Sequence, residues 1–259
     1  MTTPFRHLAV THTGGVATVV FDRPPVNAVD LGVIDEFSRL VGELAADRAV
    51  RAVILTGRER RFCAGADIAM LQDLSPEHQR RVRRWVDVQA GLEAMEKPVV
   101  AAINGYALGG GAELALACDL RLMARGAEIG FPEIRLGFFP GAGGTQRLTR
   151  HVGPARALRL MMDGRRLTAD EARALGLVDE VVPADLLQQT ARDVAERLAT
   201  GPTRAIGLLK RCVYQGHGRP LQEGLALEAE AVGELIGTAD AREGLDAFLA
   251  KRLPRFTGA

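Results

Sequence analysis

Apolar residues in the first two thirds of this chain form short continuous runs, separated by stretches with helical spacing. The runs are rich in β-branched and aliphatic residues, which predicts strands. They lie at residues 5–13, 16–23, 51–56, 98–103, 118–124, 127–130 and 177–182. Gly14-Gly15 separates the first two runs, and Pro24-Pro25 ends the second because proline cannot continue a β-ladder.

Apolar residues three and four positions apart predict helices between these runs. Asp30 is a candidate N-cap for a helix to about Asp47, and Ser75-Pro76 begins another that runs to about Met95. Beyond residue 153, helices are expected at 154–162, 169–175, 184–199, 202–215, 221–236 and 239–251, with 177–182 as the only strand. The alternation predicts an α/β core at residues 1–185, followed by a helical region at 186–259.

Composition is ordinary for a globular protein of 259 residues, with 47% hydrophobic and 25% charged residues. A net charge of +1 gives no general attraction for nucleic acid or an acidic membrane, so neither partner is expected. The N-terminal residues lack the features of a signal peptide, which predicts a cytoplasmic location. Three scattered cysteines and five histidines show no metal-ligand spacing, so no metal site is expected.

Residues 104–119, NGYALGGGAELALACD, combine three consecutive glycines with an almost wholly apolar segment. Glycines at 109–111 allow a sharp turn and close approach to a ligand. A helix starting there would aim unpaired N–H groups at an oxygen that carries negative charge. Glu113 alone breaks the apolar pattern, and a carboxylate is rarely fully buried without a partner. The stretch alone leaves two interpretations open: a packing turn with a favourable first-turn glutamate, or a catalytic site.

Other segments offer related chemistry. Residues 63–67 form a small-residue turn before a helix, and Glu133 stands at the start of a helical turn. The glycine-rich segment 138–148 is not a phosphate-binding P-loop, because no Gly-Lys-Ser/Thr follows. A nucleophilic role for Cys63 is disfavoured, since no base lies near it in sequence. The arginines at 58–61, and those at 80–84 beside Trp85, are interpreted as solvated faces rather than phosphate or RNA sites.

Four segments, taken in order, resemble the enoyl-CoA hydratase branch of the crotonase superfamily. They are RFCAGADI at 61–68, KPVVAAINGYALGGGAELALACD at 97–119, GFPEIRLGFFPGAGGTQRL at 130–148 and LTADEARALGLVDEVVP at 167–183. The ending EGLDAFLAKRLPRF at 243–256 is similar to the usual C-terminal helix. The resemblance implies an α/β fold, a crotonase-like spiral of repeated ββα units with a C-terminal helical trimerisation region. It also implies a homotrimer or a dimer of trimers.

The resemblance also implies roles for individual residues. Ala66 and Gly110 match the two N–H donors of the oxyanion hole, and Glu113 and Glu133 match the two catalytic carboxylates. Implied substrate-binding positions are Ala64, Gly65, Asp67, Ile68, Gly109, Pro132 and Gly141. The implied reaction, a step of fatty-acid metabolism, is reversible syn addition of water to a 2-trans-enoyl-CoA. Coenzyme A enters as part of the substrate, and no further cofactor is implied.

The sequence departs from the common hydratase pattern at Ala69 and Met70, where many relatives carry Lys and Glu. Arg23, Arg58 or Lys251 are therefore candidate partners for the phosphates of coenzyme A. Alternatives of the same fold are an enoyl-CoA isomerase and a dehydratase acting on a carrier-protein thioester. A non-catalytic acyl-CoA-binding or RNA-binding protein is an alternative of a different class. An isomerase needs only one base, so the second glutamate favours hydration.

Overall fold

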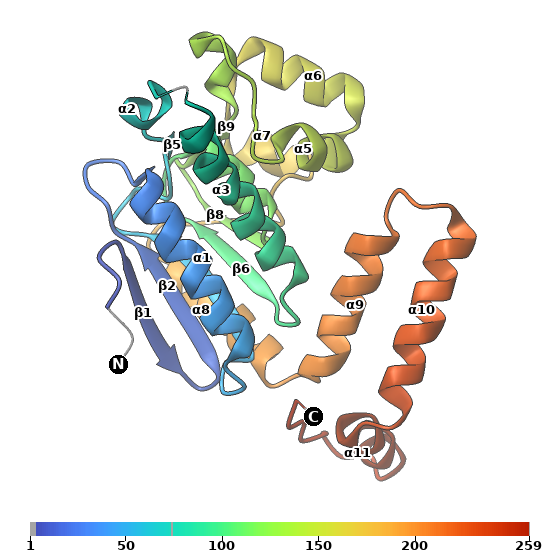
Figure 1. Cartoon of the computed structure of the whole chain (residues 1–259). Helices are drawn as coiled ribbons and strands as arrows, with labels where there is room; N and C mark the ends of the chain where they lie inside the picture. Colours follow the sequence, from blue (N-terminus) through green and yellow to red (C-terminus); the bar gives the residue numbers. More distant parts are fainter. Residues whose placement is uncertain (1–3, 74, 259) are drawn as a thin grey trace.

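The computed structural model describes residues 4–73 and 75–258, and its centre is a six-stranded sheet (Figure 1). The strand order is β1-β2-β4-β6-β8-β11, with β1 antiparallel to β2 and every other pair parallel. The strands are β1 Leu8–Thr13, β2 Val16–Phe21, β4 Ala52–Gly57, β6 Val99–Ile103, β8 Leu120–Ala124 and β11 Glu180–Val182. Every residue of β4 and β6 is buried, as expected of parallel strands covered on both faces.

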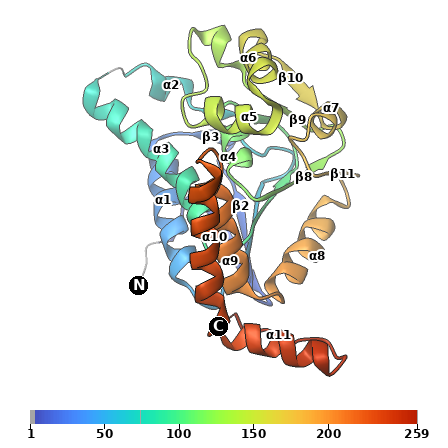
Figure 2. The same ribbon diagram turned by 90° about the vertical axis from the view of Figure 1, so that its right-hand side faces the viewer.

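Helices cover both faces of this sheet. Helices α1 (Leu31–Ala46) and α3 (Pro76–Ala94) pack against each other on one face, and α8 (Leu187–Ala199) packs on β4 and β6 from the other (Figure 2). The predicted N-caps are confirmed, since the side chains of Asp30 and Ser75 accept hydrogen bonds from the first turns of α1 and α3.

Short strands extend the carboxyl ends of the main strands and create the repeated ββα units. They are β3 Ala28–Val29, β5 Gly65–Ala66, β7 Ala107–Leu108 and β9 Glu128–Gly130. β3 leads into α1, and the other three lead into α2 Ile68–Leu71, α4 Gly110–Leu116 and the 3-10 helix η1 Pro132–Leu136. α5 Gly144–Val152 comes after η1. β3 pairs with β5, and β7 pairs with β9. These pairings bring successive units together beyond the carboxyl ends of the main strands.

The expectation of a single strand beyond residue 153 is wrong. Between α6 (Pro154–Asp163) and α7 (Ala169–Ala174), residues Arg166–Thr168 form β10, which pairs with β9. Only the central residue, Leu167, is buried. A strand of three residues is too short to show an alternating apolar pattern in the sequence, and it forms only because it pairs with β9.

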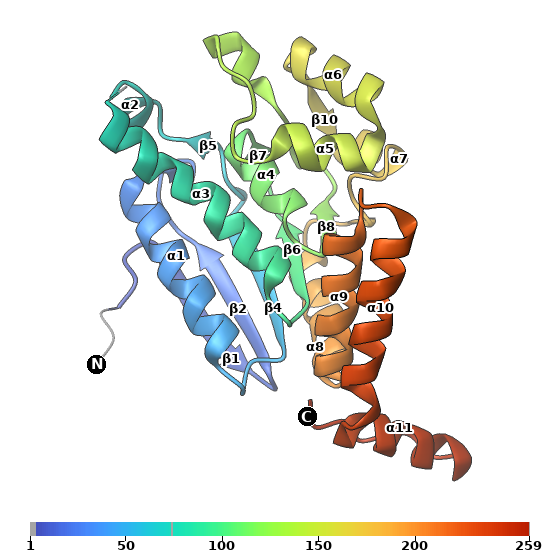
Figure 3. The same ribbon diagram turned by 45° about the vertical axis from the view of Figure 1, so that its right-hand side comes forward.

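The region 186–259 has two parts. α8 buries Leu187 and three alanines against the sheet, so the expected boundary at residue 185 separates α8 from the strands it covers. α9 (Thr203–Gly216) and α10 (Leu221–Ile236) lie side by side (Figure 3), and α11 (Ala239–Leu249) extends away from the sheet. These three helices expose many large apolar side chains, including Leu209, Val213, Leu221, Ile236 and Phe248. Within residues 4–73 and 75–258, no helix has the length and apolar character needed to cross a bilayer.

Candidate active site

The start of α4 lies directly against the short strand β5. Gly65 has φ +95°, and a Cβ atom there would lie 2.7 Å from the carbonyl oxygen of Leu108 and 3.3 Å from the backbone nitrogen of Gly110. Glycine is therefore required at this position for two reasons, the backbone conformation and the close approach. This contact places Ala66 and Gly110, the two expected oxyanion-hole donors, on the wall of one cavity.

That cavity, of about 280 Å³, is lined by every expected site residue except Asp67. The lining includes Ala64, Gly65, Ala66, Ile68, Gly109, Gly110, Glu113, Pro132, Glu133 and Gly141. The carboxylate of Asp67 accepts a hydrogen bond of 3.0 Å from the backbone nitrogen of Ala69, and so caps α2 rather than lining the cavity. It also pairs with Arg23 at 2.8 Å, so both of its oxygens have partners.

Glu113 is 2% exposed and is held by the glycine-rich turn that precedes α5. Its Oε1 atom accepts hydrogen bonds from the backbone nitrogens of Ala142 at 2.8 Å and Gly144 at 2.7 Å. Burial is the largest influence and raises the pKa of Glu113 above its usual value, while these two donors and the charge of Arg147 oppose that rise. A Cβ at residue 144 would lie 2.9 Å from Oε1, so glycine there permits the contact. The site therefore supplies donors for the ionised form of Glu113.

Glu133, in η1, has a different environment. Burial, with a smaller contribution from the negative charge of Glu113, raises the pKa of Glu133 to about 7. Its Oε2 atom is buried and has no hydrogen-bond partner among the described residues. Two carboxylates in one pocket whose surroundings differ in this way can divide into a base and an acid. The geometry favours Glu113 as the ionised member and Glu133 as the protonated member.

One wall of the cavity is apolar and was not predicted from the sequence. Val82, Trp85 and Val86 of α3 line it together with Phe138 and Phe139, which follow η1. The indole nitrogen of Trp85 also donates a 3.4 Å hydrogen bond to the carbonyl oxygen of Gly110. The spacing of 82, 85 and 86 is that of one helical face, and this signal was available in the sequence. The arginines at 80–84 beside Trp85 instead favour the interpretation of this helix face as solvated.

The remaining candidates are placed as follows. Two of the candidate phosphate partners are already paired: Arg23 with Asp30 and Asp67, and Arg58 with Asp22. Burial raises the pKa of the Cys63 thiol to about 12, which argues against a nucleophilic thiolate. Among residues 4–73 and 75–258, no three histidine, cysteine or acidic side chains gather in a way that suits a metal ion.

Comparisons with known proteins identify the family to which this chain is similar. A family profile described as enoyl-CoA hydratase/isomerase matches residues 11–259. The short-chain-enoyl-CoA hydratase of Clostridium acetobutylicum is 40% identical over 242 residues, covering 92% of this chain and 93% of that protein. The 2,3-dehydroadipyl-CoA hydratase of Escherichia coli is 38% identical over 255 residues, covering 97% of this chain and 98% of that protein.

Solved structures agree as well. A crystal structure of enoyl-CoA hydratase from Bacillus anthracis superposes with a TM-score of 0.93 at 39% identity, covering 98% of this chain and 100% of that one. A second neighbour, enoyl-CoA hydratase subunit I of Geobacillus kaustophilus, gives a TM-score of 0.94 at 41% identity, covering 99% and 100%. The spiral fold expected from the sequence is thereby confirmed, and this chain belongs to the enoyl-CoA hydratase/isomerase family.

Proposed function

We propose that this protein is an enoyl-CoA hydratase that adds water reversibly to a 2-trans-enoyl-CoA to give a 3-hydroxyacyl-CoA. The observation that carries the proposal is a pair of carboxylates, buried Glu113 and partly buried Glu133, on one cavity beside the β5–α4 contact. Hydration needs one group to take a proton from water and another to give a proton to carbon. Two backbone hydrogen bonds favour the ionised form of Glu113, and the pKa of Glu133 is raised to about 7, which supports this division. Several relatives named as enoyl-CoA or crotonyl-CoA hydratases support the same reaction.

The backbone at Ala66 and Gly110 would stabilise the charge that forms during the reaction. As water adds to Cβ, electron density moves through Cα to the thioester oxygen, which becomes an enolate. Ala66 and Gly110 both line the cavity in which that oxygen would lie. Gly110 is the first residue of α4, so its N–H has no partner within the helix. One such donor contributes about 3 kcal/mol to the stability of the transition state.

The proton transfers then follow from the two environments. Ionised Glu113 takes a proton from water as the water oxygen bonds to Cβ. Protonated Glu133 gives its proton to Cα, and the thioester carbonyl re-forms. The net change is addition of H and OH across the double bond, with the two carboxyl groups exchanging protonation states. Proton exchange with solvent restores the enzyme. The apolar wall around Trp85 would hold the acyl chain and limit the entry of other waters.

The substrate would bring coenzyme A as part of its own structure, and this chemistry calls for no metal or redox cofactor. The homotrimer or dimer of trimers and the cytoplasmic location stay predictions. The large apolar side chains that α9, α10 and α11 expose support assembly, because exposed apolar surface of this extent favours association.

The proposal is tested with crotonyl-CoA and the purified protein, followed as loss of enoyl-thioester absorbance. We expect turnover by the unmodified protein, and loss of turnover by orders of magnitude in Glu113→Gln and in Glu133→Gln. Failure of the unmodified protein with crotonyl-CoA and with longer or branched 2-enoyl-CoA substrates would contradict the proposal.

The second candidate is double-bond isomerisation, which the family description includes. An isomerase moves one proton between two carbons and needs a single base, so a second buried carboxylate has no required role. Turnover of a 3-enoyl-CoA without 3-hydroxy product, surviving Glu113→Gln, would favour this alternative. A carrier-protein thioester as the better substrate would favour the dehydratase alternative. A role in RNA binding is disfavoured, because Arg81 and Arg84 of α3 are paired with Asp35.

A further inference from the structure

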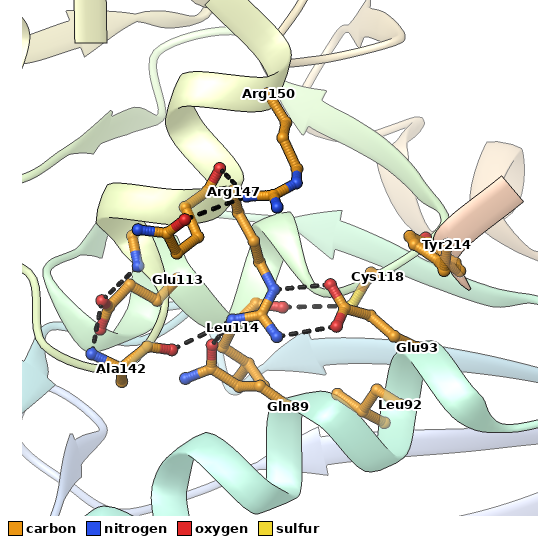
Figure 4. A network of polar contacts seen from close by, with 12 residues as sticks. Gln89, Leu92, Glu93, Glu113, Leu114, Cys118, Ala142, Arg147, Arg150 and Tyr214 are labelled. Carbon is orange, nitrogen blue, oxygen red and sulfur yellow. Dashed lines mark hydrogen bonds and ion pairs between the residues drawn. The ribbon is translucent and has the colours of Figure 1, made fainter. Parts of the chain in front are cut away.

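The turn formed by Ala142, Gly143 and Gly144 is held from two sides (Figure 4). On one side, the backbone N–H groups of Ala142 and Gly144 donate hydrogen bonds to Oε1 of Glu113. On the other side, Arg147 Nη1 donates to the carbonyl oxygen of Ala142 at 3.1 Å. A Cβ at residue 143 would lie 1.9 Å from the same Nη1 atom, so the guanidinium lies directly against the turn. The turn therefore connects a catalytic carboxylate to an arginine that does not line the cavity.

Arg147 is itself fixed by α3. Its Nε and Nη2 atoms reach the two oxygens of Glu93 at 2.6 Å and 2.8 Å, which is a bidentate pair, and its Nη1 donates to Gln89 Oε1 at 3.0 Å. The side chains of Arg147 and Glu93 are 12% and 22% exposed, so solvent competes little for the pair. A planar guanidinium bound at both edges has little freedom to rotate. The pair thus links the helix that carries Trp85 to the turn that holds Glu113.

We propose that Arg147 and Glu93 are positioning residues for the proposed hydration, which fix the 142–144 turn and through it the carboxylate of Glu113. The inference rests on the proposed function for its catalytic consequence. A displacement of about 1 Å at a catalytic group can cost about 100-fold in rate. Neither residue needs to contact the substrate to exert such an effect.

The pair also has an electrostatic consequence. The charged groups around Glu113 are Glu133 from η1, Arg147 from α5, and Glu93 and the cavity-lining Arg83 from α3. Removing the charge of Arg147 removes a stabiliser of the ionised carboxylate, so the pKa of Glu113 rises. Removing the charge of Glu93 leaves Arg147 uncompensated near Glu113, so that pKa falls. A general loosening of the fold would not produce shifts in opposite directions.

The test compares Arg147→Gln with Glu93→Gln, using kcat/KM for crotonyl-CoA as a function of pH. Asp35→Asn is the matched control, because it breaks a different arginine–carboxylate contact to α3, outside the site. We expect both test variants to lose about 10- to 100-fold in kcat/KM. The acidic limb, which reports ionisation of Glu113, moves to higher pH in Arg147→Gln and to lower pH in Glu93→Gln. The control keeps the unmodified profile.

Arg147→Lys separates charge from geometry, because lysine keeps the charge and loses the two-edged contact. We expect a lower kcat with an acidic limb close to that of the unmodified protein. If Arg147→Gln does not fold, Glu93→Gln and Arg147→Lys carry the test through the downward shift and the loss of kcat. Unchanged kcat/KM in Glu93→Gln and Arg147→Lys, or limbs that move in the same direction in both glutamine variants, would overturn the proposal.

A second measurement is independent of turnover. pH-dependent infrared difference spectra report carboxyl protonation, and the band of Glu113 is the one lost in Glu113→Gln. We expect its titration to move in opposite directions in Arg147→Gln and Glu93→Gln, even if no enoyl thioester proves to be a substrate. A Glu113 titration that is the same in both variants as in the unmodified protein would contradict the role proposed for Arg147 and Glu93. An unmodified protein without activity would contradict only the proposed function.

Discussion

Carboxylates at the base of α9 and in the cavity are largely removed from solvent, and their hydrogen-bonding needs are met differently. Asp119 fastens α9 to the sheet through Lys210 and Tyr214, and we call this group of residues the anchor. The carboxylate of Asp119 pairs with Lys210 at 2.7 Å and accepts hydrogen bonds from the backbone nitrogen of Val99 at 2.7 Å and the Tyr214 hydroxyl at 2.9 Å. Lys210 also donates to the carbonyl oxygens of Leu92 and Lys97. In the cavity, Oε2 of Glu133 has no partner within the described part of the chain.

The difference shows what each arrangement is suited for. A carboxylate whose oxygens are all paired within the protein ties two elements together, but it has no oxygen left to contact a substrate. Burial raises the pKa of both Asp119 and Glu133, but at Asp119 the charge of Lys210 and the hydrogen bonds act in the opposite direction. The pKa of Glu133 rises to about 7, so this carboxylate can hold and release a proton near neutral pH. The contrast predicts that substitutions at the anchor lower the free energy of unfolding, whereas substitutions of the cavity glutamates lower kcat.

The largest expected effect is on rate. Glu113→Gln and Glu133→Gln each remove a proton-transfer group, which contributes about 100- to 10,000-fold to catalysis. We expect kcat to fall by that factor, with a midpoint of thermal unfolding equal to or above that of the unmodified protein, because a costly buried carboxylate is removed. Turnover and thermal unfolding measured on the same samples check this. If either glutamate variant lost much stability but little kcat, the cavity carboxylates would behave like those of the anchor, and the contrast would be wrong.

Lys210→Met tests the anchor. It leaves Asp119 buried without its ion-pair partner, and breaking such a pair by removing one member costs about 3–5 kcal/mol of unfolding free energy. Denaturant unfolding measures this loss, and kcat per folded enzyme is expected to change little. Lys210→Met with Asp119→Leu removes both charges and is the control, expected to regain part of the stability. A kcat that falls as far as in the glutamate variants would show that the anchor acts on the chemistry.

How far the sequence predicted these regions depends on how local their signals are. The buried runs that become β4 and β6 and the caps Asp30 and Ser75 were predicted, because each signal lies within a few neighbouring residues. The strands β3, β5 and β7 were missed because each contains only two residues and exists through pairing with a distant segment.

In the cavity, the pattern around Glu113 suggested a buried carboxylate, whereas the roles given to Ala66 and Glu133 came only from the resemblance. The contacts around Glu113, like the small strands, could not be predicted because they join segments that are distant in the sequence. Arg147 and Glu93 are 54 positions apart, and their pairing depends on how α3 lies against α5.

The dependence of rate on pH gives a smaller effect, about tenfold for each pH unit beyond the limiting pKa. Glu133 must be protonated to donate to Cα, and its pKa is about 7, so the active form exists below that value. We therefore expect kcat/KM to fall as pH rises through about 7. The profile of Lys210→Met should have the same alkaline limb, because Asp119 takes no part in proton transfer. An alkaline limb that moves in Lys210→Met would connect the two regions electrostatically.

The smallest expected effect is that of Tyr214→Phe, which removes one of the hydrogen bonds to Asp119 and nothing else. The net contribution of such a bond is about 1 kcal/mol, rising to about 3 kcal/mol when the acceptor is charged. Because Lys210 and the backbone of Val99 still satisfy Asp119, we expect a loss toward the lower end of that range. Denaturant unfolding and kcat are measured together, and kcat should equal that of the unmodified protein. A loss as large as that of Lys210→Met would mean that the hydroxyl, rather than the ion pair, secures α9. The anchor would then resemble the cavity, where one missing partner decides how the carboxylate behaves.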